Sequence, residues 1–243
     1  MRLYGLLGYP LTHSFSQSYF AKKFETEAIH NAQYENFSLP VIDDVETVLF
    51  QQNNLCGFNI TIPYKKAILP FLHEQTDPVK EMGACNCVCI KAGKRIGYNT
   101  DIIGFAHSLK PFIRQHHTHA LILGTGGAAA AVEYVLRKAG IQYTFVSRSK
   151  NETAITYEEL SESMMQQYLL IINTSPVGQY PNIHDAPNLP YQYIGAKHHL
   201  FDLIYNPTET KFLQLGREQG ASIQNGQEML VIQAEESWRI WNS

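Results

Sequence analysis

Apolar and polar residues follow two alternating patterns along the first hundred positions. Short apolar or alternating stretches bounded by turn residues predict strands over 2–9, 32–39 and 57–63. The stretches between and after them predict helices over 16–29, 41–52 and 64–72. Residues 85–99 are typical of a hairpin, with its turn at Ala92-Gly93-Lys94. Alternating strands and helices of this kind predict an α/β fold.

The pattern changes at Thr100, which we interpret as the cap of a helix over 100–115. A strand, a glycine turn and a helix then occupy 120–140, and further strands are predicted over 143–149, 168–176 and 199–207. A last helix, 226–241, has an apolar face that suits either half of the chain, and periodicity alone does not decide which. We therefore predict an α/β protein with mostly parallel strands and two domains, 1–100 and 101–225, with their boundary near Asp101.

Composition narrows the class of protein without naming it. With 44% hydrophobic and 17% charged residues, the chain resembles a globular soluble protein rather than a disordered one. The net charge of −3 gives no electrostatic reason to expect nucleic acid or an anionic membrane as a partner. Neither a signal peptide nor an apolar run of the roughly 18–20 residues that a membrane span needs is visible. We expect a cytoplasmic protein.

Two groups of residues suggest a metal site, and in both we favour the simpler interpretation. Cys85, Cys87 and Cys89 alternate along one predicted strand and should share one side of it. They lack the paired C-x₂-C spacing of zinc sites, so we predict reduced, part-buried thiols. The histidine-rich segment 116–119 has no fourth ligand and no helical i, i+4 spacing, which favours a solvated interdomain loop. We predict no metal.

The segment "LILGTGGAAAA" carries the strongest local signal. A buried strand runs into a turn at Gly124 and Gly126, and an alanine-rich helix follows, with Ala129 completing a G-x-G-x-x-G/A pattern. Such glycines let the backbone approach a pyrophosphate at a helix N-terminus. This predicts a dinucleotide site; the alternative is a tight strand–helix turn without a ligand.

The end of the next strand indicates which dinucleotide. An NAD site normally presents an acidic residue there, but this chain reads "VSRSK", with Arg148 between Ser147 and Ser149 and followed by Lys150. A guanidinium beside hydroxyls suits a 2′-phosphate, so the pattern favours NADP(H). The alternative is that Arg148 is a solvated residue at a strand end.

A nicotinamide cofactor also requires a proton-transfer group. In "TIPYKK" the proline suits the first turn of a helix, which would place both Lys65 and Lys66 near its positive end. Neighbouring helical residues cannot both face one cleft, and spacing does not say which lysine is functional. Asp101 is a candidate carboxylate partner, although an acidic residue in a first helical turn is common by itself.

Ser14 and Ser16 stand two positions apart in "YPLTHSFSQ". If the backbone is extended there, both hydroxyls point the same way and suit a carboxylate or hydroxyl ligand. The alternative is a helix cap, a role that Ser16 alone would satisfy.

Taken together, these segments resemble the shikimate dehydrogenase family from Tyr4 to Trp241. The matching motifs occur in the family's order: "GYPLTHSFS", "GFNITIPYK", "GACNCV", "GYNTDIIGF", "LGTGGAAAA", "SR", "NTSPVG", "DLIYNP" and "NGQEMLVIQA". Four positions depart from the family pattern: Gln17, Cys87, Ala130 and the "SRSK" segment that replaces N-R-T. The first two leave the polar residues in place, whereas the last two bear on cofactor preference.

The resemblance implies a role for each matching residue. Lys65 would transfer the proton and Asp101 would assist it. The substrate would be held by Ser14, Ser16, Thr61, Asn86, Tyr205 and Gln233. The cofactor would be bound by Gly124, Thr125, Gly126, Gly127, Ala128, Ser147, Arg148, Ser149, Lys150, Leu203, Gly226 and, as a weaker candidate, Asp77. Helix 226–241 would then return to the N-terminal substrate domain, and 101–225 would be a Rossmann-type NADP-binding domain.

The implied activity is the NADPH-dependent, reversible reduction of 3-dehydroshikimate to shikimate in aromatic amino-acid (chorismate) biosynthesis. An NAD-dependent quinate/shikimate dehydrogenase is the alternative enzyme. A non-catalytic nucleotide- or metabolite-sensing module is the alternative outside enzymes. The expected partners are a small-molecule substrate and NADP(H), in a monomer or homodimer that binds neither nucleic acid nor membrane.

Overall fold

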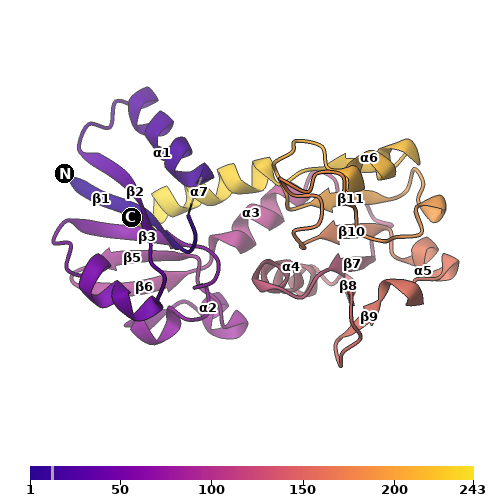
Figure 1. Cartoon of the computed structure of the whole chain (residues 1–243), viewed down its shortest axis with the longest axis horizontal. Coiled ribbons are helices and arrows are strands. Elements are labelled where there is room, and N and C mark those ends of the chain that lie inside the picture. The colour runs from indigo at the N-terminus through magenta and orange to yellow at the C-terminus, as the bar shows by residue number, and fades with distance from the viewer. Residues whose placement is uncertain (12–13) are drawn as a thin grey trace. The chain divides into compact units, whose positions relative to one another are not determined.

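The computed structural model describes residues 1–11 and 14–243. It divides into two compact units: the first unit, residues 1–103 and 230–243, and the second unit, residues 104–229 (Figure 1). Within the described part of the chain, none of the helices has the length and apolar character needed to cross a membrane.

The first unit is built on a mixed six-stranded sheet. Its strands are β1 (Arg2–Gly8), β2 (Ala32–Ser38), β3 (Leu55–Ile60), β4 (Glu74–Gln75), β5 (Cys87–Lys91) and β6 (Lys94–Tyr98). In the order β2-β1-β3-β5-β6-β4, the first three strands are parallel, and β5 runs antiparallel to both of its neighbours. The hairpin predicted over 85–99 is confirmed as β5 and β6, with Ala92 and Gly93 at positive φ in its turn.

Two helices cover one face of this sheet, α1 (Phe15–Thr26) and α7 (Gln227–Trp241) (Figure 1). Between them and the strands lies an aromatic cluster in which the Tyr4 and Trp241 rings stack at 4.8 Å. Trp241 packs so closely that a Cβ at Gly57 would lie 2.3 Å from its ring, which explains the glycine in mid-strand. The Trp241 indole N–H donates to the Val88 carbonyl at 2.9 Å.

The opposite face is covered by short turns and one short helix rather than by two long helices. The predicted helix over 41–52 is a 3₁₀ turn, η1 (Ile42–Asp44), followed by a π turn, η2 (Val45–Leu49). Its many β-branched residues disfavour a regular α-helix, although Val45 and Leu49 still reach the core. The other elements on this side are η3 (Leu69–Phe71) and α2 (Asp77–Met82).

The helix predicted over 64–72 is wrong. The chain forms separate turns there, with the Ile68 N–H donating to the Tyr64 carbonyl at 3.0 Å, and only the 3₁₀ turn η3 follows. Pro70 has no N–H to donate to the Lys66 carbonyl, so α-helical bonding cannot continue past it, and it lies instead near the start of the 3₁₀ turn η3. Lys65 therefore does not lie in the first turn of an α-helix, and the argument from a helix dipole fails.

The second unit is a Rossmann-type sheet with every strand parallel. Its strands are β7 (His119–Leu123), β8 (Gln142–Ser147), β9 (Ala154–Thr156), β10 (Leu170–Asn173), β11 (His199–Asp202) and β12 (Ser222–Gln224). The order β12-β11-β10-β7-β8-β9 reverses direction between β7 and β10. Ligands bind such sheets beyond the carboxyl ends of the strands at this reversal.

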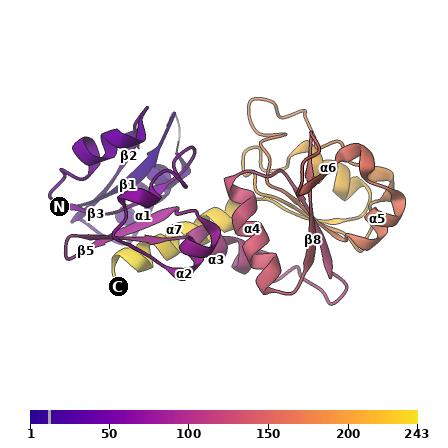
Figure 2. The ribbon, with the colours of Figure 1, turned by 90° about the horizontal axis from the view of Figure 1, so that it is seen from below.

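Helices pack on both faces of the second sheet. Phe105, from the helix α3 (Thr100–Leu109), and Val132, from α4 (Gly127–Lys138), pack on one face. Met165, from α5 (Glu162–Gln167), and Phe212, from α6 (Lys211–Glu218), pack on the other. Figure 2 shows α4 on one side of β8, with α5 and α6 on the opposite side. Short 3₁₀ turns, η4 (Tyr157–Glu159) and η5 (Tyr191–Tyr193), complete the unit.

Helix α3 differs from its prediction at both ends. It stops at Leu109 rather than at residue 115, because Pro111 disfavours a helical conformation at the residue before it. Thr100 is the first helical residue instead of the cap. The capping group comes from another part of the chain and is described below.

Candidate active site

In the first unit, Lys65 and Asp101 form an ion pair. The Lys65 Nζ donates to the Asp101 Oδ2 at 2.6 Å, and the two side chains are only 18% and 7% exposed. The Lys65 carbonyl accepts the Cys85 N–H at 2.8 Å, which fixes the turn after β3 beside the start of β5. Lys66 is exposed. The folded chain thus distinguishes the two lysines that spacing left equal.

The Asn86 side chain fixes the start of α3 and with it Asp101. Its Oδ1 accepts the Thr100 N–H at 2.6 Å, and its Nδ2 donates to the Thr100 Oγ1 at 3.1 Å. An amide oxygen at this point satisfies a free N–H of the first helical turn, which is the usual task of a capping residue. Asn86 is 5% exposed and lies one residue before β5.

The serine pair is arranged differently from the prediction. Ser14 is the N-cap of α1 and its Oγ accepts the Gln17 N–H at 3.2 Å, so the cap is Ser14 and not Ser16. Ser16 lies in the first helical turn, so an extended backbone does not align the two hydroxyls. Burial raises the pKa of the Tyr34 hydroxyl, and the nearby Ser16 side chain opposes that effect. The neighbouring Thr12 and His13 of the same motif lie outside the described residues.

Two further predicted substrate residues also belong to the first unit. Thr61 follows β3 directly, and its N–H donates to the Leu7 carbonyl of β1 at 2.9 Å. Gln233 lies half-buried on α7, where its carbonyl accepts the Ser237 hydroxyl at 2.8 Å. Asp77, by contrast, begins α2 with a side chain that is 97% exposed and 3.5 Å from the Lys80 ammonium.

In the second unit, a pocket of about 660 Å³ opens at the point where the strand order reverses. Gly124 follows β7 at φ 109°, a conformation that favours glycine, and a Cβ there would lie 3.0 Å from the Thr174 hydroxyl. Gly126 is the N-cap of α4, whose first N–H groups have no partner inside the helix. A helix N-terminus beside a glycine turn fits a pyrophosphate.

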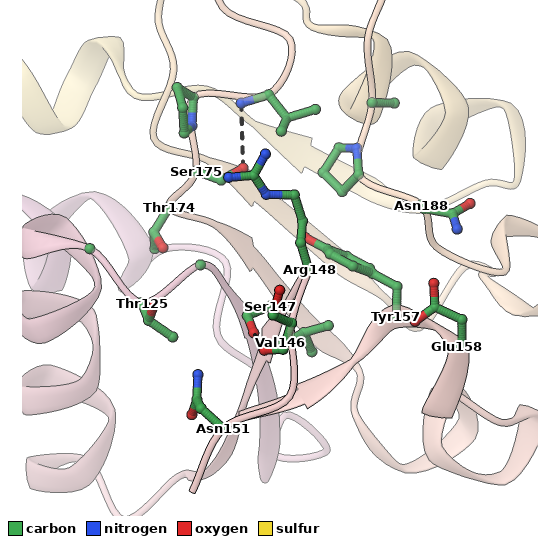
Figure 3. Close-up of a pocket in the computed structure, with 17 residues that line it drawn as sticks. Thr125, Val146, Ser147, Arg148, Asn151, Tyr157, Glu158, Thr174, Ser175 and Asn188 are labelled. Atoms are coloured by element: carbon green, nitrogen blue, oxygen red, sulfur yellow. Dashed lines mark hydrogen bonds between the residues drawn. The ribbon is translucent and has the colours of Figure 1, made fainter. Parts of the chain in front are cut away.

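The polar residues at the end of β8 form the next part of the pocket wall, as Figure 3 shows. Ser147, Arg148 and Ser149 all line it, and the Ser147 hydroxyl donates to the Ser149 carbonyl. Arg148 is exposed. Burial raises the pKa of the neighbouring Tyr157, and the positive charge of Arg148 partly offsets that effect. Lys150 forms an exposed ion pair with Glu159 at 2.6 Å.

A buried hydrogen-bond network holds the loop after β10 against the pocket. The Asn173 Oδ1 accepts the Ser175 hydroxyl at 2.7 Å, while its Nδ2 donates to the Asp202 Oδ1 at 3.0 Å. The other Asp202 oxygen accepts the Thr210 hydroxyl at 2.6 Å. Burial raises the pKa of Asp202 to about 7, against the three donors that lower it.

The pocket includes some of the predicted cofactor residues and leaves others out. Gly124, Thr125, Gly126, Ser147, Arg148 and Ser149 line it, whereas Gly127, Ala128 and Lys150 lie outside the lining that the described residues form. Leu203, Tyr205 and Gly226 also lie outside it. Two of these meet closely, because a Cβ on Gly226 would lie 2.1 Å from the Leu203 carbonyl oxygen.

Several lining residues were not predicted. They are Val146, Asn151, Tyr157, Glu158, Thr174, Ser175, Pro176, Val177, Ala186, Pro187 and Asn188. Thr174 and Ser175 follow a strand next to β7, so their position could have been inferred from the rule that adjacent parallel strands end at one edge. Tyr157, Glu158 and Asn188 reach the pocket from a 3₁₀ turn and a long loop, and no local pattern marks them.

Neither suspected metal group forms a ligand set. Among the described residues, no three His, Cys, Asp or Glu side chains come together to hold an ion. Cys87 and Cys89 pack under α7, but Cys85 packs in the cluster on the other face of the sheet. The prediction that all three share one side is wrong because Cys85 precedes β5, where strand alternation does not apply. Burial raises the pKa of Cys85 to about 12, so it stays a thiol near neutral pH.

Comparison with known proteins identifies the family. Residues 6–88 match the shikimate dehydrogenase substrate binding domain. A curated relative from Caldicellulosiruptor saccharolyticus, named shikimate dehydrogenase (NADP(+)), is 35% identical over 97% of this chain and 90% of its own length. The chain belongs to the shikimate dehydrogenase family. The resemblance drawn from the nine motifs is therefore confirmed.

Solved structures of shikimate dehydrogenases agree with this assignment. The Aquifex aeolicus enzyme is 33% identical, with a TM-score of 0.87 over 100% of this chain and 92% of its own. The Thermus thermophilus enzyme, solved in complex with NADP(H) and shikimate, is 28% identical, with a TM-score of 0.87 over 99% of this chain and 93% of its own. The predicted architecture, an N-terminal α/β substrate domain and a Rossmann-type domain, is confirmed for the family member described here.

Proposed function

We propose that this protein is an NADP-dependent shikimate dehydrogenase that reversibly reduces 3-dehydroshikimate to shikimate in chorismate biosynthesis. The observation that carries the proposal is the shielded Lys65–Asp101 ion pair, at 2.6 Å, in a chain whose family has this activity. A lysine held by a carboxylate can transfer a proton to or from an oxygen of the substrate.

In the direction of reduction, the Lys65 ammonium donates a proton to the substrate oxygen as the carbonyl becomes an alcohol. In oxidation, the neutral Lys65 amine takes the same proton back. Asp101 orients the lysine in both directions, and Asn86 holds Asp101 in place by capping α3. Because Asp101 is 5% exposed as a residue, water competes little for this hydrogen bond.

The substrate is a small polar acid, and the first unit carries the groups that would bind it. Ser14, Ser16, Thr61, Asn86 and Gln233 would hold its carboxylate and ring hydroxyls, with Tyr205 of the second unit as a further contact. Several converging hydrogen bonds would fix the ring relative to Lys65, which lowers the entropic part of the barrier.

The residues of the second unit fit NADP(H). When bound, the nicotinamide would supply or accept the hydride that accompanies the proton transfer. The pyrophosphate would lie at Gly124, Thr125 and Gly126, near the N-terminus of α4. Gly127 and Ala128, in the first turn of that helix, would bind it as well. Arg148 and the two neighbouring serine hydroxyls suit a 2′-phosphate, with Lys150 beside them. Leu203 and Gly226 would contact the nicotinamide end of the cofactor, and Asp77 is a weaker candidate for such a contact.

Steady-state rates with shikimate and quinate, each with NADP⁺ and NAD⁺, test the proposal directly. We expect NADP⁺-dependent shikimate oxidation, followed at 340 nm, to be the fastest of the four reactions. Dominant NAD⁺-linked quinate oxidation would contradict it in favour of the alternative enzyme. Cofactor binding without any change in absorbance would favour a sensing module.

We further propose that the protein acts in the cytoplasm as a monomer or homodimer. This expectation rests on the charge and composition described above and on the role of a soluble small-molecule substrate. Light scattering after size exclusion would measure the oligomeric state, and a tetramer or larger assembly would contradict it.

A further inference from the structure

A continuous chain of hydrogen bonds runs through the buried part of the first unit, behind the proposed substrate residues. The Tyr34 hydroxyl of β2 donates to the Asn59 Oδ1 of β3 at 3.0 Å. The Asn59 Nδ2 donates to the Ser237 Oγ of α7 at 2.8 Å and to the Asn86 carbonyl at 3.4 Å. Ser237 in turn donates to the Gln233 carbonyl at 2.8 Å.

Ser16 lies near the Tyr34 end of this chain, because burial raises the Tyr34 pKa and the Ser16 side chain opposes that effect. The Asn59 Oδ1 can only accept, so the Tyr34 proton is committed to it. The Tyr34 oxygen keeps its lone pairs, so toward the Ser16 hydroxyl it can only accept. The direction in which each group of the hydrogen-bond chain donates is thereby determined by the acceptor that follows it. The printed hydrogen bonds thus join groups from β2, β3 and α7 into one network.

The hydroxyl of Tyr34 is costly unless it serves this network. Tyr34 is 8% exposed and stacks on the Phe20 ring at 4.6 Å, in a cluster made mostly of aromatic and aliphatic side chains. A buried hydroxyl without partners is unfavourable, and a phenylalanine would fill the same space without that requirement. Ser237 is fully buried as well.

We propose that Tyr34 and Ser237, joined through Asn59, are positioning residues for the substrate site. They orient the Ser16 hydroxyl and the segments that carry Asn86 and Gln233, three groups that the proposed function assigns to substrate binding. The inference therefore rests on that function. The inference adds that the side chains of the hydrogen-bond network hold the substrate-binding groups in position before the substrate binds.

The central test is Tyr34→Phe, which removes one hydroxyl and keeps the ring. Losing the acceptor that the Tyr34 hydroxyl offers to Ser16, worth about one neutral hydrogen bond, should raise the KM for shikimate about five- to tenfold. The KM for NADP⁺ should stay within about twofold and kcat within about threefold, because the variant changes neither the second unit nor Lys65. Ser237→Ala should also raise the KM for shikimate.

A second measurement separates positioning from a general loosening of the fold. If Tyr34 acts through Ser16, Tyr34→Phe should add almost nothing in a Ser16→Ala background, since coupled residues are non-additive. Tyr4→Phe is the matched control: Tyr4 is also buried in the same sheet, but its hydroxyl lies outside the network, so its kinetic constants should equal those of the wild type.

Each other outcome overturns the inference. An unchanged KM for shikimate in Tyr34→Phe, equal rises in both KM values, or full additivity with Ser16→Ala would make the network a structural element only. The rate of the wild-type protein with shikimate and NADP⁺ tests the proposed function independently of the variants. If that rate is absent, the proposed function fails, whatever the variants do.

Discussion

Replacing Lys65 tests both the chemistry and the choice between two adjacent lysines. Lys65→Met keeps most of the side-chain stem and removes the ammonium. A positioned proton-transfer group is worth about 10²–10⁴ in rate, or about 3–5 kcal/mol of barrier at about 1.4 kcal/mol for each tenfold. We therefore expect kcat for shikimate oxidation to fall by that factor. Lys66→Met, at an exposed position, is the matched control and should stay near the wild-type rate.

The ion pair also predicts a change in stability. Lys65→Met leaves the Asp101 carboxylate, 7% exposed, without its partner at 2.6 Å. Breaking a fully buried pair costs about 3–5 kcal/mol, and since Lys65 is 18% exposed we expect about 2–3 kcal/mol. The double variant Lys65→Met/Asp101→Asn has no unpaired charge, so it should be more stable than Lys65→Met. It should be no less active than the less active of its two single variants, Lys65→Met and Asp101→Asn.

Two measurements decide the matter: the NADPH formation rate at 340 nm and urea unfolding of the same five proteins, which are the wild type, Lys65→Met, Lys66→Met, Asp101→Asn and the double variant. Near wild-type turnover in Lys65→Met together with loss of turnover in Lys66→Met would refute the choice of lysine. A double variant less stable than both singles would refute the account of the pair.

Other parts of the structure yield predictions of their own. Arg148→Leu should raise the KM for NADP⁺ about 10–100-fold while leaving that for NAD⁺ nearly unchanged, because a charge-assisted bond to the 2′-phosphate is worth about 1.5–3 kcal/mol; equal effects on both cofactors would contradict this. Burial lowers the pKa of His199 from 6.5 to about 4, so its stabilising effect is complete above about pH 6.5 and is lost as pH falls toward 4. The loss reaches about 3 kcal/mol, and urea unfolding at pH 7 and 4.5 should show a smaller drop in His199→Gln than in the wild type. Gly57→Ala should destabilise the fold by about 1–3 kcal/mol, because the added Cβ, 2.3 Å from the Trp241 ring, forces that ring to move; an unchanged thermal midpoint would contradict the packing described.

The sequence predicted best where one short segment contains its own physical reason. The strand, the turn at Gly124 and the helix of the second unit follow from local apolar runs and glycines, and all three are present. The hairpin at Ala92 and Gly93 is predicted equally well, because positive φ at a turn depends on neighbouring residues only.

Prediction failed where distant residues decide the local structure. Thr100 begins a helix whose cap, Asn86, comes from another segment, so no local rule could identify it. The turns around Lys65 lie where the sequence indicated a helix over 64–72, and Pro70, which has no N–H, interrupts α-helical bonding there. Tyr157 and Asn188 reach the pocket only through the folded chain. The choice of Lys65 over Lys66 came from the family resemblance, and its role stays a prediction.

The division of the chain into 1–103 with 230–243, and 104–229, has a consequence for biosynthesis. The second unit is contiguous, so a ribosome delivers all of its strands in one uninterrupted stretch. The first unit receives Trp241, its partner for Tyr4, only after the whole second unit has been translated. During that interval the aromatic face of β1 lacks its cover, so the nascent first unit exposes apolar surface of the kind that promotes aggregation before folding is complete.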